Sequence, residues 1–62
     1  MVIYENIRRF AKESGKTISD VEVGAGITKQ TIWRWDKHSP SIDKVKAVAD
    51  YLGVTIDELV NS

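Results

Sequence analysis

Five short segments with helical apolar periodicity fill this chain of 62 residues. In the first segment, Ile3, Ile7 and Phe10 recur at the spacing of one helix face, and charged residues occupy the opposite side. No segment alternates apolar and polar residues as a half-buried strand does. The sequence therefore predicts an all-α domain of five helices, with a single domain over residues 1–62.

Capping signals separate the predicted helices. Glycine is common just after the end of a helix, where the backbone turns left-handed, and Gly15, Gly26 and Gly53 all follow apolar periodic segments. Thr17 with Asp20, and Thr55 with Glu58, have the spacing of capping boxes that begin a second and a fifth helix. Gly24 lies inside the second helix, where glycine costs roughly 0.5–1 kcal/mol relative to alanine, and no local reason accounts for it.

The middle of the chain predicts two further helices. Thr28 is a good N-cap for a third helix over about residues 28–37. Pro40 disfavours helical geometry in the residue before it, so the third helix ends before Pro40. A fourth helix begins with Ser41 as its cap, or with Ser39 as the cap and Pro40 at the first helical position.

Charge is balanced in total but uneven along the chain. Nine basic and nine acidic residues cancel, which is not the usual composition of a nucleic-acid binder. Residues 28–46 nevertheless hold five basic and two acidic side chains, whereas residues 47–62 hold three acidic and no basic ones. A chance scatter in so short a chain accounts for this segregation equally well.

Composition excludes several classes of function. The chain has no cysteine, and His38 is its single histidine, so we expect no disulfide, no metal site and no cofactor. No nucleophile–base pair or glycine-rich phosphate loop indicates an enzyme or a small-molecule substrate. No apolar run is long enough to span a membrane and no signal peptide is recognisable, so we expect a cytoplasmic protein.

The turn at Gly26 and Ile27 is the central feature of the sequence. Two short helices joined by a tight glycine-containing turn are typical of a helix-turn-helix motif, whose second helix enters the DNA major groove. On the third predicted helix, one side carries Thr28, Thr31, Ile32 and Trp35, and the other carries Gln30, Trp33, Arg34 and Lys37, with Lys29 at the flank. The second side is polar and positively charged.

These residue types suit the reading of base edges. Arg34 and Lys29 can donate to guanine, and Gln30 can pair with adenine. Trp33 can contact thymine methyls or sugar, bury itself in a protein partner, or pack on a neighbouring helix. We therefore expect base contacts from Lys29, Gln30, Trp33 and Arg34, although an ordinary solvated helix face would also carry such polar residues.

Helix N-termini on either side of this segment predict contacts with the DNA backbone. Free N–H groups and the positive end of the helix dipole attract phosphate. The expected phosphate contacts are Thr17, Ser19, Thr28, Lys37 and Ser41.

At this point the sequence resembles the lambda-type phage repressors and Cro proteins, also called the XRE family, over about residues 3–60. The most specific residues are Ile32-Trp33-Arg34-Trp35-Asp36, Pro40-Ser41-Ile42, Val45, Val48-Ala49, Leu52-Gly53-Val54-Thr55 and Asp57-Glu58-Leu59. The resemblance implies a phage or bacterial five-helix domain, with base contacts from Thr28, Lys29, Gln30 and Arg34. The sequence departs from the family pattern at Ile18, where a phosphate-binding glutamine is frequent, and at Glu22, where a small alanine is frequent.

The resemblance also implies a partner and a role. Members commonly dimerise through the last helix and the loop before it, which predicts a homodimer interface at Val54, Ile56 and Val60; these residues could instead close the core. We expect a transcriptional repressor that binds double-stranded DNA. The alternative is a helix-turn-helix fold used for protein contact, as in an antitoxin-like or anti-repressor module that uses Trp33.

Overall fold

The computed structural model describes residues 2–61 and folds them into four α-helices and one 3₁₀ helix, with no strand among these residues. In chain order the elements are α1 (Val2–Glu13), α2 (Ile18–Ala25), the 3₁₀ helix η1 (Ile32–Asp36), α3 (Ile42–Leu52) and α4 (Ile56–Val60). The predicted all-α class is confirmed, and the third of the five elements is not an α-helix. Both ends of the domain expected over residues 1–62 lie outside the described residues.

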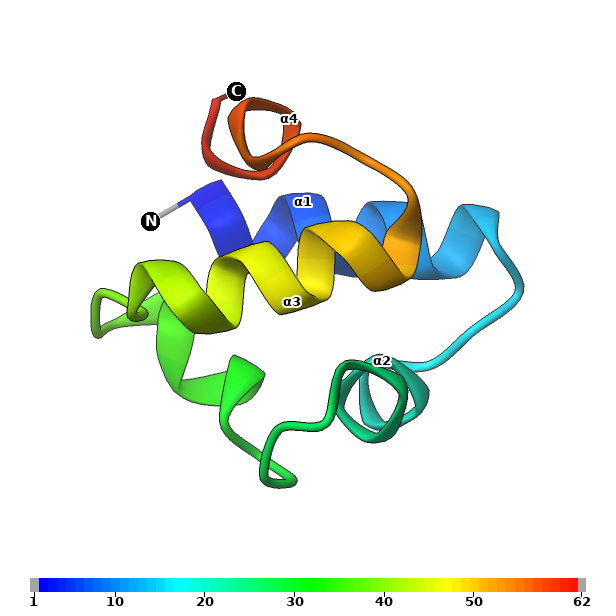
Figure 1. Ribbon diagram of the computed structural model, residues 1–62, viewed down its shortest axis with the longest axis horizontal. Helices are drawn as coiled ribbons and strands as arrows, with labels where there is room; N and C mark the ends of the chain where they lie inside the picture. The colour runs from blue at the N-terminus through cyan, green and yellow to red at the C-terminus, as the bar shows by residue number, and fades with distance from the viewer. Residues whose placement is uncertain (1, 62) are drawn as a thin grey trace.

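The helices surround one apolar core. α3 crosses the middle of the molecule, with α1 and α4 on one side and α2 on the other (Figure 1). The buried apolar side chains are Ile3, Ile7, Ala11, Val21, Ile32, Trp35, Val45, Val48, Ala49 and Leu59. Full burial of a valine, leucine or isoleucine side chain among them stabilises the fold by about 1.5–3 kcal/mol. None of the helices in residues 2–61 has the length and apolar character needed to cross a membrane.

Both predicted capping boxes are present. At α2 the Thr17 hydroxyl accepts the N–H of Asp20 at 3.1 Å, and the Asp20 carboxylate accepts the N–H of Thr17 at 3.0 Å. At α4, Thr55 and Glu58 make the same reciprocal pair. The backbone hydrogen bond from Thr17 lowers the pKa of Asp20 below its usual value, and the Thr17 side chain adds to this effect. The first turn of α2 therefore holds a carboxylate at its N-terminal end.

Gly24, which has no local explanation in the sequence, is required by the packing of α2 against α3. A Cβ atom built at Gly24 would overlap the ring of Tyr51. The same ring is covered by the Lys16 ammonium, 5.5 Å from the ring centroid. The glycine thus lets an aromatic ring of α3 lie directly on the backbone of α2.

Replacing Gly24 by alanine should therefore lower the free energy of unfolding, although alanine is the better helix former. Overpacking of this kind typically costs about 1–3 kcal/mol, against a gain in helix propensity of up to about 1 kcal/mol. Urea denaturation measures the balance. In a Tyr51→Ala background the obstructing ring is gone, and Gly24→Ala should become neutral or stabilising. The same loss of stability in both backgrounds would contradict this explanation.

The third element corrects the prediction made from the sequence. An α-helix was expected over residues 28–37 with Thr28 as its N-cap, but residues 29–31 form a turn and the helix is a 3₁₀ helix confined to Ile32–Asp36. Gln30 has a φ of 70°, which interrupts any continuous right-handed helix. Thr31, and not Thr28, occupies the N-cap position, and its side chain makes no capping hydrogen bond.

The physical reason lies in the hydrogen bond of the Ile32 N–H. In an α-helix capped by Thr28 this group would donate to the Thr28 carbonyl, but here it donates to the buried Glu22 carboxylate at 3.0 Å. Residues three apart lie above one another on a 3₁₀ helix. Ile32 and Trp35 have this spacing, and both are buried in the core. An α-helix would place this pair on one face as well, so the change of helix type leaves their burial intact.

Candidate nucleic-acid interface

A fixed turn joins α2 to the segment that follows it. Gly26 ends α2 in the left-handed conformation, with a φ of 75°, as expected for glycine at this position. The N–H of Ile27 donates to the carbonyl of Glu22 at 3.0 Å, and the Ile27 side chain packs against the core. The chain therefore leaves α2 in a defined direction, as the helix-turn-helix prediction requires.

Beyond the turn, the side chains divide as predicted. We call the exposed residues Lys29, Gln30, Trp33, Arg34 and Lys37 the outer face. Trp33 is 67% exposed, whereas Ile32 and Trp35 are buried beneath it. One detail of the prediction is wrong: Thr28 was expected on the inner side, but it is exposed, because the turn displaces it from the helix. The outer face carries three cationic side chains and no acidic one.

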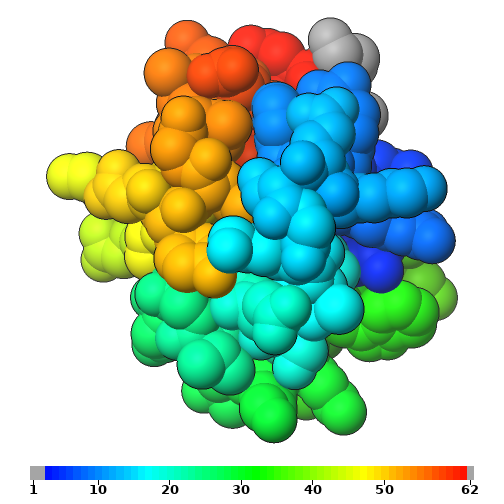
Figure 2. Space-filling view, turned by 90° about the vertical axis from the view of Figure 1, so that its right-hand side faces the viewer, coloured from blue at the N-terminus to red at the C-terminus, as the bar shows by residue number. Residues whose placement is uncertain are grey.

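The outer face lies at one edge of the molecule. In the space-filling view the green residues after α2 form the lower edge, whereas α4 lies at the top (Figure 2). In Figure 1, which has the same vertical axis, this segment rises from the lower edge along the left side to the start of α3, and α4 again lies at the top. A large partner can therefore approach the outer face without meeting α4.

The buried side chain of Glu22 binds the backbone at the start of η1. This side chain is only 3% exposed, and its Oε2 accepts the backbone N–H of Ile32 at 3.0 Å. The N–H groups at the start of a helix have no partner within the helix, so the carboxylate satisfies one that would otherwise be buried and unpaired. Sequence reasoning noticed Glu22 only as a departure from the family pattern. An acidic residue beside the buried Val21 is the signal that could have identified it.

Trp33 combines exposure with a packing contact. Its ring meets the ring of Tyr4 on α1 edge to face, with 5.7 Å between the centroids. Such aromatic pairs contribute about 0.5–1.5 kcal/mol beyond the burial of area. The contact orients the indole and leaves most of it exposed, so Trp33 is available to a ligand.

The five expected phosphate contacts are all exposed, but they differ in how they are engaged. At the start of α2, Thr17 already shares two hydrogen bonds with Asp20. Ser41 precedes α3 in the extended conformation of an N-cap, yet its hydroxyl makes no capping bond. Lys37 and Thr28 stand at the two ends of the segment that contains the outer face. The structure thus leaves the N-terminus of α3 more open than that of α2.

The three residues expected at a dimer interface also differ. Val54 and Ile56 are half-buried and pack against the core, which is the alternative role considered for them. Val60 is 42% exposed. Within residues 2–61, no group of three histidine, cysteine or acidic side chains is placed to hold a metal ion.

Comparison with known proteins identifies the family. The family model for the Cro/C1-type helix-turn-helix DNA-binding domain matches residues 6–61, which include α2, the turn and η1. None of the curated proteins compared with the chain matches it. Proteins of this family are typically non-enzymatic. The chain therefore belongs to the Cro/C1-type helix-turn-helix DNA-binding family, whose fold binds double-stranded DNA in transcription regulation.

Proposed function

We propose that this chain is a sequence-specific repressor that inserts η1 and the turn before it into the major groove of double-stranded DNA. The observation that carries the proposal is the division of this segment into a buried pair, Ile32 and Trp35, and a cationic outer face. A small domain of this kind needs no further activity to repress, because a protein bound at a promoter excludes other proteins from the same DNA. The functional domain in this proposal spans residues 1–62.

Four side chains of the outer face are the proposed base readers. Arg34 and Lys29 can donate to the acceptor pair of guanine, and Gln30 can both donate to and accept from adenine. Gln30 stands on the turn and not on the helix, so it reaches the groove from the N-terminal side of η1. Trp33 offers an apolar surface to thymine methyl groups, with its ring supported by Tyr4.

The proposed backbone contacts flank these readers. Thr28 and Lys37 bracket the outer face, and Thr17, Ser19 and Ser41 stand near the N-termini of α2 and α3. Of the two helix ends, that of α3 is the stronger candidate, because the Asp20 carboxylate already occupies the end of α2.

We also propose that the protein binds DNA as a homodimer through Val54, Ile56 and Val60. A dimer of this family type would contact two half-sites about 34 Å apart, one turn of the double helix. The exposure of Val60, and the location of α4 away from the outer face, support this arrangement.

Selection of bound duplexes from a random pool, followed by a salt titration, tests the proposal. We expect a paired sequence motif, and a logarithm of affinity that falls linearly with the logarithm of salt concentration. Each neutralised phosphate contributes about −0.9 to the slope, so the measured slope gives the number of cationic contacts. Failure to retain any duplex at low salt would refute DNA binding and favour the protein-contact function, in which Trp33 meets a protein partner.

A further inference from the structure

The proposed DNA contacts leave unexplained a pocket of about 280 Å³ between the start of α1 and η1. We call it the aromatic pocket, and it is lined by Tyr4, Trp33, Arg34, Asp36, Lys37 and His38. Cavities that hold drug-sized molecules have volumes of about 300–1,000 Å³. The aromatic pocket is slightly smaller than these, so it suits a molecule built on a single ring.

Two aromatic rings form a corner of the aromatic pocket. The rings of Tyr4 and Trp33 lie at 90° to each other, with 5.7 Å between their centroids. A third ring in this corner can stack on one of them and meet the other edge to face, the two arrangements that aromatic pairs prefer. Tyr4 is half-buried and packs against the core, whereas Trp33 is 67% exposed and keeps most of its ring surface open. The corner therefore favours a planar aromatic ligand.

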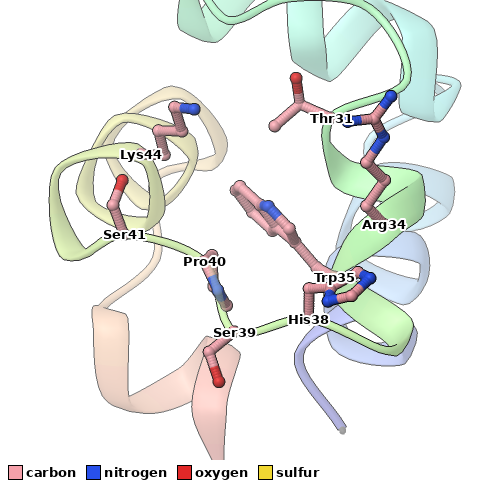
Figure 3. Close-up of a pocket in the computed structure, with 8 residues that line it drawn as sticks. All are labelled: Thr31, Arg34, Trp35, His38, Ser39, Pro40, Ser41 and Lys44. Carbon is pink, nitrogen blue, oxygen red and sulfur yellow. The ribbon is translucent and has the colours of Figure 1, made fainter.

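The charge of the lining favours an anionic ligand. Arg34 and Lys37 are cationic, and a guanidinium or ammonium group pairs well with a carboxylate. His38 adds a ring N–H donor, and both Arg34 and His38 also line the neighbouring pocket between η1 and α3 that Figure 3 draws. Among the described residues, Asp36 is the acidic member of the lining, and it already interacts with another group of the chain.

We propose that the aromatic pocket binds a small aromatic carboxylate, and that this molecule acts as an inducer, which releases the protein from DNA. The proposal rests on the DNA-binding function above, because the ligand and the DNA would compete for Trp33 and Arg34. A ligand ring stacked in the corner takes up the indole surface that the proposed thymine contact uses. Ligand and duplex therefore exclude each other, and each weakens the binding of the other by the same factor.

Benzoate is the probe, with benzamide and cyclohexanecarboxylate as matched controls. Benzamide keeps the ring without the charge, and cyclohexanecarboxylate keeps the charge without the aromatic ring. The readout is the indole N–H resonance of Trp33 in the NMR spectrum, which is identified by its loss in Trp33→Phe. We expect benzoate to move this resonance with a dissociation constant of about 1 mM, as for a ligand of so few atoms. Each control should bind about fivefold more weakly, and the resonance of the buried Trp35 should stay in place.

Two substitutions on α1 test the location of the ligand. Tyr4→Leu removes one ring of the corner, so benzoate should bind about fivefold more weakly and no better than cyclohexanecarboxylate. Phe10→Leu is the matched control, because Phe10 is also a half-buried aromatic residue of α1 but does not line the aromatic pocket. Circular dichroism checks that both variants are folded. Equal losses in the two variants, or equal binding of all three probes to the unmodified protein, would overturn the proposal.

Release of the selected duplex tests the inducer role. At ten times the dissociation constant of benzoate, about one-tenth of the protein keeps an empty pocket, so the apparent affinity for the duplex should fall about tenfold. Sodium cyclohexanecarboxylate at the same concentration adds the same salt and should lower the affinity only about threefold. Equal effects of the two salts would reduce the release to ionic strength and refute the inducer role.

The two arms separate failure of this inference from failure of the proposed function. If the unmodified protein binds no duplex at all, the proposed function fails and the inducer role fails with it, while the benzoate titration still decides whether the pocket takes an aromatic carboxylate. If the protein binds duplex but benzoate leaves the Trp33 resonance unmoved, only this inference fails.

Discussion

Replacing Glu22 by alanine should lower the free energy of unfolding by about 2 kcal/mol. The change removes the acceptor of the Ile32 N–H and leaves a buried donor unpaired, which typically costs about 1–3 kcal/mol. A domain of this size rarely has more than about 3–5 kcal/mol in total, so the loss is a large share of its stability. Thermal denaturation should show a melting temperature lower by about 10 °C.

Two variants separate the hydrogen bond from the charge. Glu22→Gln keeps an oxygen that can accept the Ile32 N–H and should restore much of the stability. Glu13→Ala removes an exposed carboxylate at the end of α1 and should change the stability very little. If Glu22→Ala melted at the unmodified temperature and gained helical circular dichroism, the segment would have rewound as an α-helix, and Glu22 would have no supporting role.

The effect should extend to DNA binding. Ile32 is the first residue of η1, so loss of its anchor frees the start of the element that carries Trp33 and Arg34. Amide hydrogen exchange at Ile32 should become faster in Glu22→Ala than in Glu22→Gln. Affinity for the selected duplex, measured at a temperature where both variants are folded, should be lower for Glu22→Ala than for Glu22→Gln.

The division between buried and exposed residues in η1 was predictable although the type of helix was not. Residues three apart share a face in an α-helix and in a 3₁₀ helix alike. Ile32 and Trp35 are therefore anchors in both geometries, and Trp33 is exposed in both. The capping boxes at Thr17 and Thr55 were predictable for a related reason, since each depends on residues only three positions apart.

The features that sequence reasoning missed depend on contacts distant along the chain. Glu22 bonds to Ile32, ten residues away, and the ring of Tyr51 on α3 lies against Gly24 on α2. Local periodicity carries no information about such pairs. The left-handed backbone at Gln30 was missed because glycine usually signals this conformation, and no glycine stands there.

Replacing Arg34 by alanine should lower the affinity for the selected duplex about ten- to hundredfold and relax the preference at one base position. This follows from the loss of a two-pronged contact with guanine, which is worth roughly 1–3 kcal/mol. Arg34 is exposed, with its side chain on the η1 side of the pocket drawn in Figure 3, so the fold should be unaffected. The measurement is the affinity for a set of duplexes that differ from the selected one at single positions.

Lys37→Ala is the matched control, since it removes an exposed cation from the same segment. As a phosphate contact, Lys37 should weaken binding equally on all duplexes and make the salt slope shallower by about 0.9. The Arg34 variant should instead lose most affinity on the selected duplex and little on duplexes already changed at the base it reads. Equal losses on every duplex would make Arg34 a further backbone contact like Lys37, and base reading would then rest on Lys29, Gln30 and Trp33.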